Sequence, residues 1–227
     1  METAQRVVRR NRLYSRLVSV LVYVSFLLLC YSVWRQNAPD TLTGSWPWKL
    51  ELLDVQSAAT ATVGSLGAAL ARAQYARAVR PALGYFGRVM ADMAPGERLA
   101  WACSVFNAAQ DVAVVEEISY LVVLTARSED AEEQTDWVNR EEAERTVVDR
   151  GPESRTDFAL HAIGVGRPVP AQGVMPLGWF TAAAMAQVRD VFVRVRVTDR
   201  VGDTHERIIS MLKGADRSAR RVDPPMI

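Results

Sequence analysis

An unbroken apolar run is the strongest pattern in this sequence. Residues 17–34 read LVSVLVYVSFLLLCYSVW without a charge, and as a helix they would extend about 27 Å at 1.5 Å per residue. Because this length matches the hydrocarbon core of a bilayer, we predict a transmembrane helix over 17–34. Most of the preceding positive charge comes from Arg6, Arg9, Arg10, Arg12 and Arg16. The positive-inside rule therefore places residues 1–16 in the cytoplasm as a basic N-terminal segment.

A cleaved signal peptide is the alternative interpretation, since it also combines a basic start with an apolar run. Small residues suited to cleavage are missing, because Tyr31, Val33, Trp34 and Arg35 stand where they should occur. The run is also longer than the core of a usual signal peptide. We therefore favour an uncleaved anchor.

A second uncharged run, residues 55–71, has few large apolar side chains and many small ones. In a helix the small residues form a face that lets another backbone approach closely, and the helix-packing residues we predict are Ser57, Ala61, Gly64, Ser65, Ala68 and Ala69. We expect an external loop over 35–54 and a returning transmembrane helix with a cytoplasmic extension over 55–80. The open alternative is an Ala-rich soluble helix, which would leave the rest of the chain outside the cell.

Beyond Pro81 the pattern changes to alternating apolar and polar residues. The segments with the composition of strands are 83–90, 98–106, 112–124, 157–165, 191–198 and 204–212. An acidic segment, 129–150, is rich in helix formers, and 180–187 is a second, shorter helix candidate. The predicted fold is a membrane α-helical hairpin plus a mainly-β soluble domain over 81–213. We expect that domain to be a sandwich or barrel of about six to eight strands with one inserted helix, followed by a flexible tail over 214–227.

Composition and charge exclude several classes of protein. The chain has 227 residues with ordinary aromatic and charged content and two cysteines, which argues against disorder and against a disulfide scaffold. Residues 1–80 contain ten basic and four acidic side chains, whereas residues 81–227 contain 17 and 22. Because the second part is acidic and lacks a basic cluster with interleaved aromatics, we predict no binding to nucleic acid.

Few residues suit catalysis or metal binding. Asp199, Asp203, His205 and Glu206 surround one predicted hairpin, where carboxylates and an imidazole could meet a divalent cation or another ligand, although a polar turn explains them equally. His161 lies within an apolar strand, and Cys30 and Cys103 lie in apolar runs that predict buried thiols. Common nucleophile, metal and phosphate-loop motifs are absent from the sequence. We therefore predict no enzymatic activity and no cofactor.

Several short motifs follow the predicted hairpin in a definite order. They are Arg80-Pro81-Ala82-Leu83, Ser104-Val105-Phe106-Asn107, a small-residue turn into Val112-Ala113-Val114, Pro168-Val169-Pro170-Ala171, and Asp-x-x-Gly-x-x-His at Asp199, Gly202 and His205. From about residue 17 to 212 the chain resembles a loose group of uncharacterised bacterial membrane proteins that tether a small β-sandwich to the cytoplasmic leaflet. Its architecture is also similar to two-helix, β-barrel membrane effectors of bacterial antiviral systems, a likeness that does not by itself imply function.

These predictions describe a protein of the bacterial inner membrane with the N-terminus and the β-domain in the cytoplasm. Its expected partners are the lipid bilayer and, through the small-residue face, a second copy or a membrane partner protein. We expect the β-domain to recognise a protein or a small ligand. The alternative function is a defence effector, in which ligand binding to the β-domain reorganises the hairpins and breaches the membrane.

Overall fold

The computed structural model describes residues 2–44, 46–47, 50, 52–125 and 136–224. The chain divides into two compact units, a helical unit of Asn11–Ala78 and a β-rich unit that combines Met1–Arg10 with Val79–Ile227. The helical unit is thus inserted into the sequence of the β-rich unit. We describe each unit by itself.

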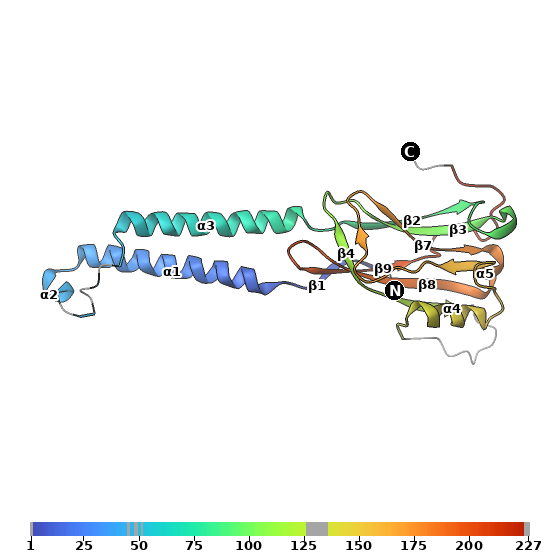
Figure 1. The fold of residues 1–227 in the computed structure, drawn as a ribbon, viewed down its shortest axis with the longest axis horizontal. Coiled ribbons are helices and arrows are strands. Elements are labelled where there is room, and N and C mark those ends of the chain that lie inside the picture. The colour runs from blue at the N-terminus through green and yellow to red at the C-terminus, as the bar shows by residue number, and fades with distance from the viewer. Residues whose placement is uncertain (1, 45, 48–49, 51, 126–135, 225–227) are drawn as a thin grey trace. The chain divides into compact units, whose positions relative to one another are not determined.

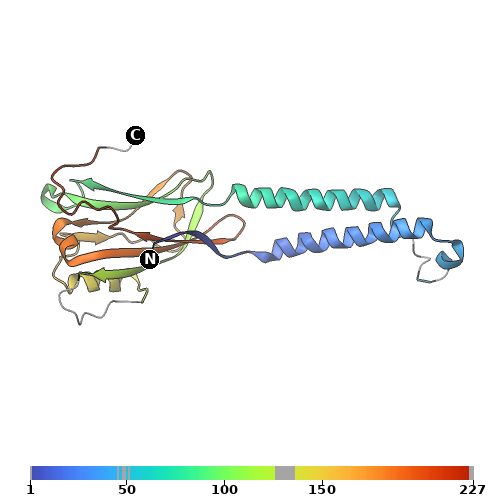
Figure 2. The ribbon, with the colours of Figure 1, turned by 180° about the vertical axis from the view of Figure 1, so that it is seen from behind.

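The helical unit is a hairpin of two long helices, α1 (Arg12–Asn37) and α3 (Val55–Ala78), with a short helix α2 (Asp40–Thr43) between them. Figure 2 shows α1 and α3 lying side by side. At the start of α3 the Asp54 carboxylate accepts a hydrogen bond of 2.8 Å from the Ser57 N–H. The helix ends three residues before Pro81, which cannot continue it. The predicted pair of helices is therefore present.

Among the described residues, α1 is the one helix that is long and apolar enough to cross a membrane, judged by length and composition. Helix α3 contains 24 residues and so has sufficient length, at about 36 Å. Its small and hydroxyl-bearing side chains lower its apolar character.

The β-rich unit contains two antiparallel sheets that stack as a sandwich (Figure 1). The five-stranded sheet has the spatial order β1 (Thr3–Arg9), β9 (Thr204–Ser210), β8 (Val188–Thr198), β4 (Ala113–Leu124) and β6 (Pro168–Val169). The four-stranded sheet has the order β2 (Leu83–Met90), β3 (Ala100–Asn107), β7 (Val174–Thr181) and β5 (Phe158–Leu160). The mainly-β prediction is confirmed as a sandwich, with nine strands among the described residues instead of six to eight.

The core lies between the two sheets. On β8 the alternation predicted from the sequence holds, and the valines at 191, 193, 195 and 197 are fully buried. Leu177 and Phe180 of β7 are equally buried on the facing sheet. Trp101 of β3 also reaches the core, where its indole N–H donates a hydrogen bond of 2.8 Å to the carbonyl of Met211. This bond removes the cost of burying the indole donor.

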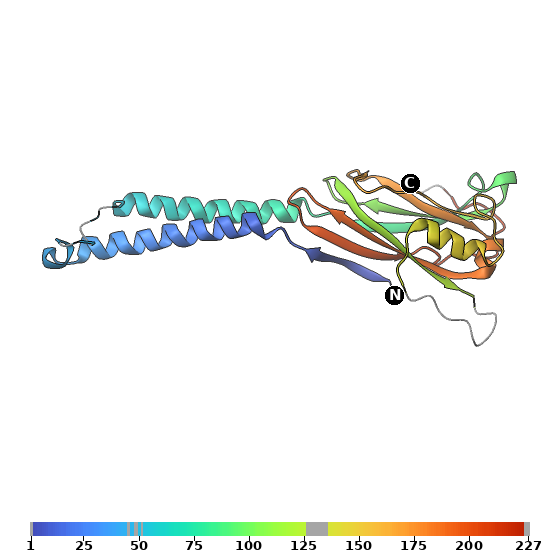
Figure 3. The same ribbon diagram turned by 60° about the horizontal axis from the view of Figure 1, so that its bottom comes forward.

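Two further helices and one 3-10 turn, η1 (Pro95–Glu97), complete the described part of this unit. Helix α4 (Arg140–Val148), in front in Figure 3, packs against β4 and β5, one strand of each sheet, and its Ala143 and Val147 are fully buried in the core. It accounts for the last part of the acidic segment predicted as a helix, while residues 126–135 lie outside the described residues. Helix α5 (Ala182–Gln187) starts later than predicted, because Phe180 and Thr181 still belong to β7.

Several strands were missed or misjudged. The segment Thr3–Arg9 was predicted as part of a separate basic N-terminus, but it forms β1 and pairs with β9. Strand β7 was missed because its sequence, VMPLGWFT, contains Pro and Gly, which are typical of turns. The strand predicted over 157–165 is only three residues long, because the chain leaves the sheet after Leu160.

The tail from residue 214, which we predicted to be flexible, contacts the sandwich as far as residue 223. The guanidinium of Arg217 donates hydrogen bonds to the carbonyls of Met185, Val188 and Arg189. The Asp223 carboxylate accepts a hydrogen bond of 2.7 Å from the Val89 N–H, and the Asp223 backbone N–H donates one of 3.1 Å to the Val89 carbonyl. These contacts hold the tail against the sandwich.

The side chain of Gln5 joins the edges of the two sheets. Its amide donates a hydrogen bond of 2.6 Å to the Pro81 carbonyl and accepts one of 2.8 Å from the Leu83 N–H. The amide thus pairs with the start of β2 as a strand residue would. Tyr85 of β2 adds a bond of 2.6 Å from its hydroxyl to the Glu2 carboxylate.

We expect Gln5→Ala to lower the free energy of unfolding by about 1–3 kcal/mol, because it leaves a partly buried carbonyl and N–H without partners. The measurement is urea unfolding of the full-length chain in detergent micelles. Gln110→Ala changes an exposed loop residue and should have little effect. Equal effects of the two substitutions would contradict the role assigned to Gln5.

Candidate functional site

The four residues predicted as a metal or ligand group lie at the turn between β8 and β9, but they do not converge. Gly202 adopts the positive φ of 82° that the predicted turn requires. His205 and Glu206 are neighbours on β9 and therefore point to opposite faces of the sheet. The described residues contain no group of three or more His, Cys, Asp or Glu side chains that could hold a metal ion. The proposed sharing of one ion by these residues is therefore wrong.

His205 and Asp199 instead form a buried pair. The His205 Nε2 atom lies 2.9 Å from Asp199 Oδ2, and both side chains are almost fully buried. The other Asp199 oxygen accepts hydrogen bonds of 3.0 Å from the Val201 N–H and 2.9 Å from the Asp203 N–H. The Asp199 carboxylate thus holds the turn through backbone hydrogen bonds, and His205 fixes the orientation of that carboxylate.

Glu206 belongs to a row of alternating charges across four strands of the five-stranded sheet. The register places Arg6 of β1 opposite Glu206, Glu206 opposite Arg196 of β8, and Arg196 opposite Glu117 of β4. Arg6 and Arg196 lie 2.6 and 2.7 Å from the Glu206 carboxylate. Glu117 accepts bonds from both Arg196 and Arg194. We call these five residues the charge row.

The charge row leaves few side chains available to bind a ligand on this face of the sheet. Arg194 also donates a bond of 2.9 Å to the Ser119 hydroxyl, and its guanidinium lies 4.9 Å from the ring centroid of Trp137. Arg194 and Arg196 lie two residues apart on β8 and therefore point to the same face of the sheet. Their guanidinium groups are engaged by carboxylates of the chain itself, so the row stabilises the sheet and holds β1 in it.

We expect Glu206→Gln to lower the free energy of unfolding at pH 7 by about 1.5–3 kcal/mol, because hydrogen bonds from Arg6 and Arg196 to a charged group are replaced by contacts with a neutral amide. Burial opposes ionisation of Glu206, but hydrogen bonds from Arg196 and Arg6 outweigh it and hold the pKa below 4.5. The stabilisation is therefore complete above about pH 4.5 and disappears as the pH falls through the lower pKa of the folded state.

Urea unfolding between pH 7 and pH 3 measures this difference. Glu153→Gln, at an exposed position, is the matched control and should behave like the parent chain. A Glu206→Gln effect that stays constant over this pH range would refute the assignment.

In the helical unit, the contact between α1 and α3 is made by small and hydroxyl residues. On α3 these are Ala58, Thr62 and Ser65, all buried, and on α1 they are Ser25 and Ser32. The Thr62 hydroxyl lies 3.1 Å from the Ser25 carbonyl, and the Ser32 hydroxyl donates a bond of 2.8 Å to the Leu53 carbonyl. Close packing of helix backbones is therefore present, as expected for small residues.

The predicted helix-packing residues divide between this contact and an exposed face. Ser65 is buried and Ala69 is partly buried, whereas Ser57, Ala61, Gly64 and Ala68 are exposed. The contact itself is formed by Ala58, Thr62 and Ser65. Cys103 is buried, as predicted, and Cys30 lies on a face of α1 that the chain itself leaves exposed.

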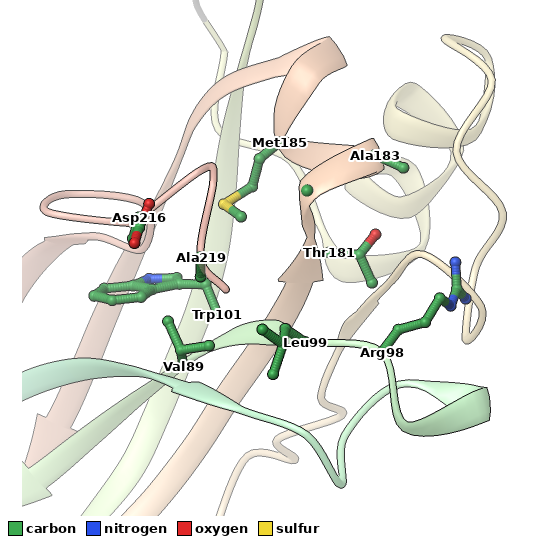
Figure 4. A pocket seen from close by; sticks show the side chains of 11 residues that line it. Val89, Arg98, Leu99, Trp101, Thr181, Ala183, Met185, Asp216 and Ala219 are labelled. Carbon is green, nitrogen blue, oxygen red and sulfur yellow. The ribbon is translucent and has the colours of Figure 1, made fainter. Parts of the chain in front are cut away.

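A cavity of about 340 Å³ opens at the end of the sandwich near α5 (Figure 4). Its apolar lining includes Leu99, Trp101 and Met185. Arg98 lies at this cavity but is directed away from Trp101 in Figure 4, and its guanidinium is bound by Asp157 at 3.0 Å. The charge of Arg98 is thus already neutralised by the chain itself. No local sequence signal indicates the cavity, because strands, α5 and the tail all contribute to it.

Known proteins do not identify the site. No protein-family model matches the chain, and no curated protein is significantly similar to it. Function must therefore be inferred from the connectivity of the two units and from the side chains that remain available for binding.

Proposed function

We propose that the protein is a membrane-anchored, non-enzymatic binding module of the bacterial inner membrane. In this proposal α1 and α3 cross the bilayer as a hairpin, and the sandwich binds a partner or ligand in the cytoplasm. The observation that carries the proposal is the pairing of β1 with β9. Only two residues separate the end of β1 from the start of the apolar helix α1.

This pairing constrains how the chain can cross a membrane. A strand can join a sheet only on the side of the bilayer where that sheet lies. If α1 crosses, the chain must therefore cross back before β2. Helix α3 is long enough for this return, and it leads into β2 through only a few residues. In this proposal, the reason to place α3 across the bilayer is therefore the topology of the chain and not the modest hydropathy of α3.

Hydrogen bonding within the helices supports a position in hydrocarbon for α3. The Thr60 hydroxyl donates to the Gln56 carbonyl at 2.9 Å, and the Ser65 hydroxyl donates to the Thr62 carbonyl at 2.9 Å. The Thr62 hydroxyl also lies 2.8 Å from the Ala58 carbonyl oxygen. A hydroxyl bonded to the backbone of its own helix costs less in lipid than a free one.

The same pairing argues against removal of α1 as a signal peptide. Cleavage after the apolar run would remove β1, and with it Arg6 from the charge row and the Gln5 bridge to β2. Arginines also follow the expected pattern of a cytoplasmic side, since Arg10, Arg12 and Arg16 precede or begin α1 and Arg72, Arg77 and Arg80 end or follow α3.

Cysteine labelling tests the topology. In a Cys30→Ser background, we expect Thr41→Cys, in α2, to react with a membrane-impermeant maleimide added to spheroplasts. Val165→Cys, on the sandwich and 77% exposed, should react only after lysis. Labelling of Val165→Cys in intact spheroplasts would overturn the proposed orientation.

Self-association is proposed through the exposed small-residue face of α3. We expect Ala61→Leu to reduce crosslinked oligomers of the full-length chain in detergent, because the larger side chain prevents close approach of a second helix. Val63→Leu, at a position 70% exposed on another face of α3, is the matched control and should preserve them. A parent chain that is strictly monomeric at every detergent ratio contradicts this part of the proposal.

A further inference from the structure

The outer face of the four-stranded sheet carries a second cavity, of about 190 Å³, which shares no lining residue with the cavity at the end of the sandwich. We call it the sheet groove. Small residues of the two central strands line it: Ala102 and Ser104 of β3 and Gly178 of β7. The rest of its apolar lining comprises Phe86, Met90, Met93, Val174, Pro176 and Trp179.

Three polar side chains from separate segments line the sheet groove. Cross-strand pairing sets Phe86 opposite Ser104, and Arg88 of β2 opposite Ala102. His161 directly follows β5 and is held beside β7 by a bond of 2.9 Å from its N–H to the Leu177 carbonyl. Arg88, Ser104 and His161 therefore border one apolar space, although the sequence separates them widely.

These three side chains are not used by the fold. Within the described part of the chain, no hydrogen bond or ion pair engages the side chain of Arg88, Ser104 or His161. Arg88 contrasts with the arginines of the charge row, each of which faces a carboxylate. Among the described residues that line the groove there is no acidic side chain. The groove therefore presents one uncompensated positive charge.

His161 adds hydrogen-bonding capacity without a second charge. Burial lowers its pKa, and the nearby positive charge of Arg167 lowers it further. The imidazole is consequently neutral at pH 7, with one nitrogen as donor and the other as acceptor. Ser104 supplies a hydroxyl that can donate to an anion.

We propose that the sheet groove binds a small oxyanion, a carboxylate or a phosphate, that carries a single ring-sized apolar group. The guanidinium of Arg88 matches the geometry of such an anion with two parallel hydrogen bonds. Ser104 and His161 provide further donors, and Phe86 and Trp179 provide apolar surface for the ring. The volume is below that of most drug-sized sites, which limits the ligand to about one ring. This inference rests on the proposed binding function and specifies its ligand class.

Titration of the full-length protein in detergent micelles tests the proposal. The probes are phenylacetate, phenyl phosphate and the neutral benzyl alcohol, followed by ligand-observed saturation-transfer NMR with empty micelles as the blank. We expect saturable binding of at least one anion, and at least tenfold weaker binding of benzyl alcohol. The two anions together decide between a carboxylate and a phosphate.

Substitutions assign the binding to the groove. Arg88→Gln should weaken anion binding at least tenfold, whereas Arg145→Gln, at an exposed position of α4 that does not line the groove, should leave it unchanged. Ser104→Val narrows the groove without touching the charge and should also weaken binding, which provides a second readout if Arg88→Gln does not fold.

Either of two results overturns the inference: neither anion binds saturably, or binding survives in the folded variants at Arg88 and Ser104. Failure here is distinguishable from failure of the proposed membrane topology. The labelling of Thr41→Cys and Val165→Cys does not depend on the groove, and the titration does not depend on which side of the membrane the sandwich occupies.

Discussion

The antiparallel pairing of β1 with β9 is the interaction on which the rest of the structure depends. It adds the first residues of the chain to a sheet built from the last ones, and Arg6 and Glu206 meet across it although about 200 residues separate them. Gln5 extends the same strand to the second sheet. Because β1 continues almost directly into α1, both ends of the helical unit are covalently joined to one sandwich.

The two outer faces of that sandwich use their polar residues differently. On the five-stranded sheet, arginines and glutamates neutralise one another in the charge row. On the four-stranded sheet, Arg88 lies beside small and apolar residues and has no acidic partner among the residues that the structure describes. A paired charge mainly stabilises the strands that carry it, whereas an unpaired charge beside an apolar cavity is available to a ligand.

The two long helices, α1 and α3, have different roles in the proposed hairpin. Helix α1 is apolar enough to face lipid, while α3 offers small residues that allow close contact and hydroxyls bonded to its own carbonyls. Ala58 rather than Ala61 lies in the contact between them, because the two helices meet along the face that Thr62 and Ser65 share. The residues predicted for packing on the neighbouring face remain exposed and accessible to another helix.

Local patterns in the sequence were sufficient for the features that depend on near neighbours. The apolar run of α1, the end of α3 before Pro81, the alternating valines of β8 and the turn at Gly202 all follow from spacing or from backbone preferences. Only the tertiary structure decided which distant segments meet. It placed basic Thr3–Arg9 in a sheet, directed His205 and Glu206 to opposite faces, and brought Arg88, Ser104 and His161 around one groove. Strand pairing and sheet stacking determine these contacts over long sequence separations, so no local window of residues contains them.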